Sequence, residues 1–318
     1  MSNIPVVGSD EYVERLKSAH RPGGEKVLAF YEHRLGVIGT DAKLMLMLWD
    51  DHLVHRGDGV FETMKWVNGK LYQLDPHLTR MRCSAGAIHL APPCPMEDIR
   101  DICIQVAKAA NRPHGMVRLL LGRGPGGFGI DPLECPVPSL YVVAYTFSPK
   151  PEEAYDKGVT AFRTSIPAKQ SYMATIKSTD YLPNMLMKRE AVEKGYDYPI
   201  CFDHLDFLAE GAVENVCIVD AGGTIRVPAF DNCLAGTTMR RAIELIGGEI
   251  PVDFGKIRES EIHDAREFII VGTTADAVSV VRYNDKPIHD ARPGPVAKRM
   301  RQLLQKDLED TGIVVYGA

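Results

Sequence analysis

The sequence lacks the features of membrane-spanning, secreted and nucleic-acid-binding proteins. No apolar run approaches the roughly 18 residues that a membrane helix needs, and the first residues, MSNIPVVGSDEYVERLK, hold neither an apolar core nor a small-residue cleavage site. The formal net charge of −5 and the pI of about 6.1 provide no basic surface for nucleic acid or anionic membrane. We therefore expect a cytoplasmic protein that binds small molecules, without nucleic-acid or membrane binding.

Disulfides and metal sites are not expected either. The cysteines are odd in number, scattered and without a Cys-x-x-Cys pair, which indicates free thiols in a reducing compartment. His52 and His55 lie among aspartates, but a strand-turn segment would place these groups on different faces, so we expect no metal. The cysteines are Cys83, Cys94, Cys103, Cys135, Cys201, Cys217 and Cys233.

The chain does have the composition of a globular protein. With 45% hydrophobic residues, its 318 residues are enough for two domains with a sizeable core. Short strands and helices are mixed without a regular βαβ alternation, which predicts a mixed α+β fold. The stretch SPKPEE from residue 148 is typical of a linker. We expect an N-terminal domain at 1–147 with a helical extension at 1–26, a linker at 148–154 and a C-terminal domain at 155–318.

Local patterns predict the main elements. Asn68-Gly69 and Ala221-Gly222-Gly223 each separate two strand-like runs and predict hairpin turns. The apolar run LMLMLW at 44–49 belongs to the predicted strands. Helical spacing and capping residues predict helices at about 9–20, 75–90, 96–111, 182–195, 237–247 and 294–309.

The segment from Lys177 to Asn215 holds the residues best suited to chemistry. Lys177 follows the alternating run SYMATI, so the pattern predicts a lysine at the end of a strand, and a helix follows it. Lysine is a titratable amine whose pKa falls on desolvation, which suits Schiff-base chemistry. Glu210 stands in Ala-Glu-Gly near the other end of the segment. By residue type alone, a solvated lysine and a surface carboxylate at a hairpin end are the alternatives.

Five ordered segments resemble the class IV aminotransferases, which are fold type IV of the pyridoxal 5′-phosphate enzymes. The resemblance implies a smaller N-terminal α/β domain, a larger C-terminal domain built on a mixed β-barrel-like core that binds the cofactor, and a homodimer. The segments are HRGDGVFET at 55–63, DPHLTR at 75–80, the segment from Lys177 through AEGAVEN, LAGTTMRR at 234–241 and VGTTADAV at 271–278.

The resemblance also implies roles for individual residues. Lys177 forms the Schiff base with pyridoxal 5′-phosphate and then moves the proton as general base and acid. Glu210 keeps the pyridine nitrogen protonated, and Arg80 binds the phosphate through its forked guanidinium. Asp180 stands where the family has an asparagine-like residue. The other cofactor residues implied by the match are Tyr181, Leu234, Gly236, Thr237, Thr238, Gly272, Thr273 and Thr274.

The glycine-rich stretch GRGPGGFG at 122–129 fits the spacing of a dinucleotide-binding turn, but the prolines that follow forbid the helix that such a turn opens. We interpret it as a loop over the substrate pocket, as in the resembling family. Phe61 and Met116 stand where D-amino acid and branched-chain enzymes carry a tyrosine, so Arg118 remains to receive a carboxylate. The expected substrate residues are Phe61, Arg118, Phe128, Thr274 and Ala275.

Three functions follow from the resemblance. The first is transfer of an amino group between an amino acid, D-amino or branched-chain, and a 2-oxo acid. The second is an aminodeoxychorismate lyase that releases pyruvate and 4-aminobenzoate, and the third is a family member without catalysis. The apolar run at 44–49 would be hard to leave exposed on a monomer, which favours a homodimer that buries it. The alternative is that the run forms a core strand buried on both faces.

Overall fold

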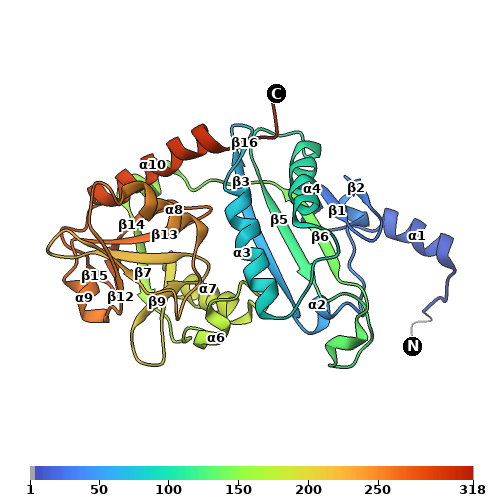
Figure 1. The fold of residues 1–318 in the computed structure, drawn as a ribbon, viewed down its shortest axis with the longest axis horizontal. Coiled ribbons are helices and arrows are strands. Elements are labelled where there is room, and N and C mark those ends of the chain that lie inside the picture. The colour runs from blue at the N-terminus through green and yellow to red at the C-terminus, as the bar shows by residue number, and fades with distance from the viewer. Residues whose placement is uncertain (1–3, 318) are drawn as a thin grey trace.

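The computed structural model describes residues 4–317, which form two β-sheets with helices packed on each (Figure 1). The first sheet has seven strands in the order β16-β4-β3-β5-β6-β1-β2. The second has nine, in the order β12-β11-β10-β13-β14-β7-β8-β9, with β15 beside β14. This arrangement confirms the mixed α+β fold.

The helices are α1 (Ser9–Ser18), α2 (His52–His55), α3 (Leu74–Ala87), α4 (Met96–Ala109), α5 (Glu152–Lys157), α6 (Ser171–Ala174), α7 (Leu182–Lys194), α8 (Thr237–Ile246), α9 (Glu259–His263) and α10 (Pro295–Thr311), with 3-10 turns η1 (Gly24–Lys26), η2 (Ala42–Leu44) and η3 (Pro132–Glu134). The strands are β1 (Val27–Glu32), β2 (Val37–Gly39), β3 (Gly59–Val67), β4 (Lys70–Leu71), β5 (Gly115–Gly122), β6 (Ser139–Tyr145), β7 (Val159–Arg163), β8 (Tyr198–Phe202), β9 (Leu208–Gly211), β10 (Asn215–Val219), β11 (Ile225–Pro228), β12 (Val252–Gly255), β13 (Glu267–Gly272), β14 (Asp276–Tyr283), β15 (Lys286–Pro287) and β16 (Ile313–Val314).

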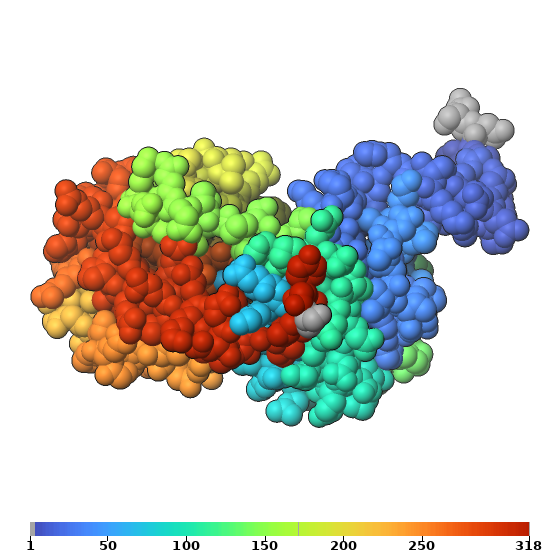
Figure 2. Space-filling view, turned by 90° about the horizontal axis from the view of Figure 1, so that it is seen from above, coloured from blue at the N-terminus to red at the C-terminus, as the bar shows by residue number. Residues whose placement is uncertain are grey.

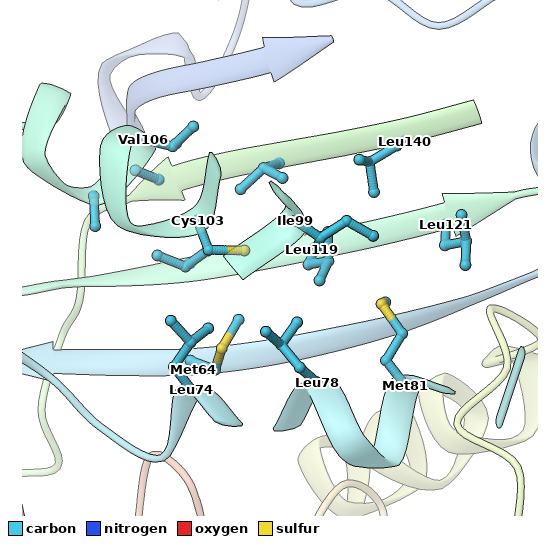
Figure 3. Packing of buried hydrophobic residues seen from close by; sticks show 14 of the residues in the cluster. Met64, Leu74, Leu78, Met81, Ile99, Cys103, Val106, Leu119, Leu121 and Leu140 are labelled. Atoms are coloured by element: carbon cyan, nitrogen blue, oxygen red, sulfur yellow. The ribbon is translucent and has the colours of Figure 1, made fainter. Parts of the chain in front are cut away.

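The two faces of the first sheet have different environments. Alternate side chains of a strand point to opposite faces, so Met64 of β3 and Leu119 of β5 lie in the core beneath α3 and α4 (Figure 3). Phe61, Thr63 and Arg118 occupy the alternate positions and face the second half of the molecule. The strand period therefore builds a hydrophobic core on one face and the wall of a cavity on the other.

The second sheet is more deeply buried. Strands β10 and β13 are buried along nearly their whole length, because one face packs around Phe268 and the other lies beneath α8 and α10. The strand pairs β7–β8, β7–β14 and β11–β12 are parallel, and the other pairs are antiparallel. Strand β9 at one end lies near β10 in the middle, so the sheet curls as the expected barrel-like core does.

Both predicted hairpin turns are confirmed. Asn68 and Gly69 connect β3 to β4 with φ angles of 51° and 77°, and the positive sign at both positions is what a type I′ turn requires. Gly223, with φ of 88°, lies in the turn between β10 and β11. The order of the residues around each turn was enough to locate these hairpins.

The predicted strand at 44–49 is wrong. After the short turn η2 the chain is irregular, and Leu46 and Trp49 expose 49% and 80% of their surface. The run leads from η2 to the turn at Trp49 and Asp50, and none of its residues pairs with a strand of either sheet. The alternative of a core strand buried on both faces is thereby excluded.

The structure also corrects the expected setting of two other segments. Residues 171–174 form the helix α6. Lys177 follows in an extended stretch that is hydrogen-bonded to β3, where Phe61 N donates to Lys177 O at 3.0 Å. Lys177 is therefore held beside a strand of the other sheet. His52 and His55 lie in the short helix α2, where a strand and turn were expected. The strand β14, which forms a hairpin with β13, was not predicted from the sequence.

The C-terminal end of the chain links the two halves, whereas the N-terminal end does not. Helix α10 crosses from the second sheet toward the first, where β16 pairs with β4 (Figures 1 and 2). The expected linker at 148–154 overlaps the first residues of α5. Helix α1 projects from the body and buries none of its residues (Figure 2). None of the helices within residues 4–317 is long and apolar enough to cross a membrane.

Candidate active site

A cavity of about 590 Å³ lies between the first sheet and the second half of the molecule. Its walls come from the outward face of β3 and β5, the stretch around Lys177, the start of α8 and the turn between β13 and β14. The structure brings most of the predicted site residues together here. Those that line it are Phe61, Arg80, Arg118, Lys177, Tyr181, Glu210, Leu234, Gly236, Thr237, Thr238, Gly272, Thr273 and Thr274.

Lys177 projects a buried amine into this cavity. Its Nζ donates to the Tyr181 hydroxyl at 3.0 Å and lies 4.6 Å from the centre of the Phe61 ring. Burial lowers the pKa of Lys177 to about 8, and the positive charge of Arg80 acts in the same direction. The side chain therefore titrates near neutral pH, as a nucleophile and a proton carrier must.

Glu210 places a carboxyl group in the same cavity. It stands at the end of β9, and its Oε2 accepts a hydrogen bond from Leu234 N at 3.3 Å. Burial raises the pKa of Glu210 to about 7, against the opposing effects of Leu234 N–H and Lys177. Asn215 Nδ2 fixes the same segment by donating to Leu234 O at 2.7 Å.

The start of α8 forms a third part of the site. Thr237 and Thr238 are the first residues of this helix, where backbone N–H groups have no acceptor within the helix and the helix dipole favours an anion. Arg80 reaches the same region, and its Nη1 donates to Ala235 O at 3.3 Å. The turn from Gly272 to Thr274 lies between β13 and β14 and completes this end of the cavity.

Two neighbours of Arg80 were missed by the sequence analysis. Glu62 receives hydrogen bonds from Arg80 Nε at 2.8 Å and Arg80 Nη2 at 2.7 Å, and His77 Nδ1 lies 2.6 Å from the same carboxylate. Glu62 lies in the segment HRGDGVFET and His77 in the segment DPHLTR, and a sequence pattern marks each of them. Glu62 is a charged residue on the core-facing phase of β3, and His77 precedes Arg80 by one helical turn.

Arg118 stands on the sheet wall of the cavity between two aromatic rings. Its guanidinium lies 5.7 Å from the ring centre of Phe61 and 5.6 Å from that of Tyr145, and its Nε donates to Thr63 Oγ1 at 3.4 Å. Thr63 could have been found as the next residue on the same face as Phe61. Tyr145 belongs to β6, and nothing in the sequence connects it to this wall.

Two predicted substrate residues lie outside the cavity wall. Phe128 is 73% exposed, and its carbonyl accepts from Arg56 Nη2 at 2.6 Å. Ala275 is buried behind the turn that carries Thr274. The glycine loop forms no helix after Gly122, as expected, and Gly124 packs so closely that a Cβ there would meet Val137 O at 1.9 Å. Within one chain, this loop packs beside α2 and leaves the cavity wall to other residues.

The donors of the cavity fit pyridoxal 5′-phosphate. The raised pKa of Glu210 shows that this buried carboxylate has too little positive charge near it. A protonated ring nitrogen would supply that charge. The start of α8 with Arg80 offers N–H donors to a phosphate. The Lys177 amine stands free of any salt bridge with the described residues, ready to bond an aldehyde carbon.

Comparisons with known proteins agree with this geometry. Residues 59–283 match the family described as amino-transferase class IV. The chain is 36% identical to the chloroplastic D-amino-acid transaminase of Arabidopsis thaliana over 96% of this chain and 83% of the relative. It is 28% identical to a putative branched-chain-amino-acid aminotransferase of Methanocaldococcus jannaschii, over 87% of this chain and 95% of the relative.

Solved structures show the same fold. The branched-chain aminotransferase of Thermoproteus uzoniensis superposes with a TM-score of 0.80 at 22% identity, covering 89% of this chain and 95% of that one. A hypothetical aminotransferase from Mycobacterium tuberculosis, in its pyridoxal 5′-phosphate-bound form, superposes with a TM-score of 0.74 at 24% identity, covering 89% of this chain and 99% of that one. The lyase alternative gains no support from these relatives. The chain therefore belongs to the class IV aminotransferases and is a pyridoxal 5′-phosphate-dependent enzyme.

Proposed function

We propose that this enzyme transfers the amino group of a D-amino acid to a 2-oxo acid, with Lys177 as the residue that bonds the cofactor and moves the proton. The observation that carries the proposal is the pairing of Lys177 and Glu210 in one cavity. Their pKa values are shifted toward each other, to about 8 and about 7, by the same burial. Both groups can therefore gain or lose a proton near neutral pH.

The cofactor, when bound, supplies an aldehyde and a ring that accepts the negative charge developing on the substrate carbon. Lys177 Nζ would take the proton from that carbon and deliver it to the cofactor carbon that carried the aldehyde, and the Tyr181 hydroxyl orients the amine. Glu210 would hold the ring nitrogen, and Leu234 would pack against the ring. Arg80, Gly236, Thr237, Thr238 and the Gly272–Thr274 turn hold the phosphate.

The substrate carboxylate is received by Arg118 in this proposal. Its guanidinium points into the cavity, is held by Phe61 and Tyr145, and has no acidic side chain as a salt-bridge partner among the described residues. Thr274 offers a second polar group to the substrate from the opposite wall. A guanidinium fixed between two rings loses little freedom when a carboxylate binds.

The D-amino acid donor is supported by the relative from Arabidopsis, which is named a D-amino-acid transaminase. A branched-chain L-amino acid is the second candidate, because Met47, Leu53, Met116 and Leu120 make much of the cavity wall apolar and the archaeal relative carries that name. A screen of D- and L-amino acids with pyruvate and 2-oxoglutarate, beside an aminodeoxychorismate assay, decides between them. Activity with L-amino acids alone contradicts the first proposal.

A homodimer is part of this proposal. Trp49, Phe128, Ile130 and Leu133 expose 73% to 88% of their surface on two loops that the His52 N to Gly124 O hydrogen bond of 3.1 Å connects. Apolar groups gathered in this way are typical of an interface. Light scattering at micromolar concentration is expected to give twice the 35.2 kDa chain mass. Trp49→Glu is expected to weaken the dimer, with Tyr12→Glu on α1 as the matched control.

The location and the division of the chain are proposed as well. The seven free thiols favour a reducing compartment, so we propose the cytoplasm. The Arabidopsis relative is named chloroplastic, which makes a plastid the alternative that a fluorescent fusion tests. The proposed domains meet at 148–154, and preferential cleavage there in limited proteolysis is the expected result.

A further inference from the structure

The phosphate end of the cavity holds a chain of buried polar groups that crosses between the two halves of the molecule. Glu62 is fully buried on β3, yet it accepts from both Arg80 and His77. His77 Nε2 in turn lies 3.1 Å from Thr237 Oγ1, the hydroxyl of the first residue of α8. The chain of contacts leads from Glu62 to His77 and from His77 to Thr237. Arg80 lies beside it and donates to Ala235 O.

The charges of this chain fix where its protons lie. Burial alone would raise the pKa of Glu62, but the hydrogen bonds from Arg80 and from His77 lower it to about 2, so Glu62 is ionised. Burial lowers the pKa of His77, an effect that outweighs the opposing pull of Glu62, so the imidazole is neutral at physiological pH. A neutral imidazole carries one N–H and one acceptor nitrogen.

The tautomer of His77 follows from the contact with Glu62. A carboxylate only accepts, so the nitrogen 2.6 Å from it, Nδ1, must carry the hydrogen. Nε2 is then the acceptor, and the partner at 3.1 Å, Thr237 Oγ1, must donate to it. The hydroxyl hydrogen of Thr237 is therefore used within the protein and is not available to an anion at the helix start.

We propose that Glu62, His77 and Thr237 are positioning residues, a relay that fixes the start of α8 before the phosphate binds, with Thr237 donating its hydroxyl hydrogen to His77 and offering the phosphate its backbone N–H alone. This inference rests on the proposed phosphate site. It divides two adjacent threonines: the hydroxyl of Thr238 has no hydrogen-bond partner among residues 4–317 and can donate to the phosphate, whereas the hydroxyl of Thr237 anchors the helix to α3. Arg80 is neutralised by Glu62, so neutral N–H donors and the helix dipole supply much of the binding.

Side-chain ¹⁵N NMR of the apo-protein tests the proton positions without cofactor or turnover. The His77 signals are identified by their loss in His77→Gln. We expect a neutral ring with hydrogen on Nδ1, and a ring with hydrogen on Nε2, or an imidazolium at pH 7, overturns the relay. This result is independent of the identity of the catalytic lysine, so a failure of the relay and a failure of the proposed function are distinguishable.

A double-mutant cycle tests whether the Thr237 hydroxyl bonds His77 or the phosphate. Thr237→Val is expected to weaken binding of inorganic phosphate by the apo-protein about tenfold, the effect of one lost hydrogen bond, and Thr237→Ser is expected to restore it. In a His77→Phe background, Thr237→Val should change the affinity by less than about twofold, because the acceptor is already gone. An undiminished tenfold loss in that background means that Thr237 donates to the phosphate and overturns the inference.

Discussion

The two ends of the cavity differ in how their charges are balanced. Among the described residues, Lys177 and Glu210 have no salt-bridge partner, and their hydrogen-bond partners are the neutral Tyr181 hydroxyl and the Leu234 amide. At the other end, Arg80 and Glu62 are joined by two hydrogen bonds. Burial without a counter-charge moves a pKa toward neutral pH, whereas a buried pair stays ionised. One end is thus suited to moving protons and the other to holding an anion.

The largest effect is expected from removing the amine at the first end. Lys177→Ala should abolish turnover and leave the fold intact, because a methyl group can neither bond the cofactor nor carry the proton. Lys169, which also lines the cavity, provides the matched control. Borohydride reduction and peptide mapping should find the cofactor on Lys177 in the wild type and in Lys169→Ala. A label on any other lysine removes Lys177 from its proposed role.

Glu210→Gln tests whether a charge is needed opposite Lys177. We expect turnover to fall by about 10²- to 10³-fold, since an amide does not keep the ring nitrogen protonated. Cofactor affinity should change much less, because the phosphate contacts remain. Glu214→Gln is the control, as this carboxyl lines the same cavity on the same segment. Equal losses in the two variants would show that the position of Glu210 has no special role.

Arg80→Met tests the paired end. Glu62 would remain buried without its partner, which costs about 3–5 kcal/mol of folding free energy. Cofactor affinity should fall as well. Arg80→Lys should recover part of the lost stability and part of the lost affinity, because lysine restores the positive charge but not the paired hydrogen bonds of the guanidinium. Urea unfolding and equilibrium dialysis measure the two effects. A variant that loses affinity with unchanged stability would show that the Glu62 pair is not needed for folding.

The smallest effect expected is a shift in pH dependence. Only the neutral amine attacks an aldehyde, so the rate at which the apo-enzyme bonds pyridoxal 5′-phosphate should rise with pH and level off above about pH 8. A solvated lysine would level off near its ordinary value of 10.5. The charge of Glu210 opposes the lowered pKa of Lys177, so Glu210→Gln should move the midpoint to lower pH. Stopped-flow absorbance measures both profiles.

The sequence alone was sufficient for features that depend on a few neighbouring residues. The turn at Asn68-Gly69 and the start of α8 at Thr237 were both predicted, because turn preferences and helix caps act over four residues or fewer. Most of the residues that the family resemblance named line the cavity, and only Phe128 and Ala275 do not.

Only the tertiary structure decided the features that depend on residues far apart in the chain. The run at 44–49 has the composition of a strand, but a strand forms only where the fold brings a partner strand beside it, and residues 44–49 pair with no strand of either sheet. The run before Lys177 forms the short helix α6, and the stretch that follows takes its hydrogen bonds from β3, which lies far away in the chain. His77 and Thr237 are 160 residues apart, and no local pattern records that their side chains meet. A hydrogen bond across such a distance is set by how the two sheets pack, which local propensity does not encode.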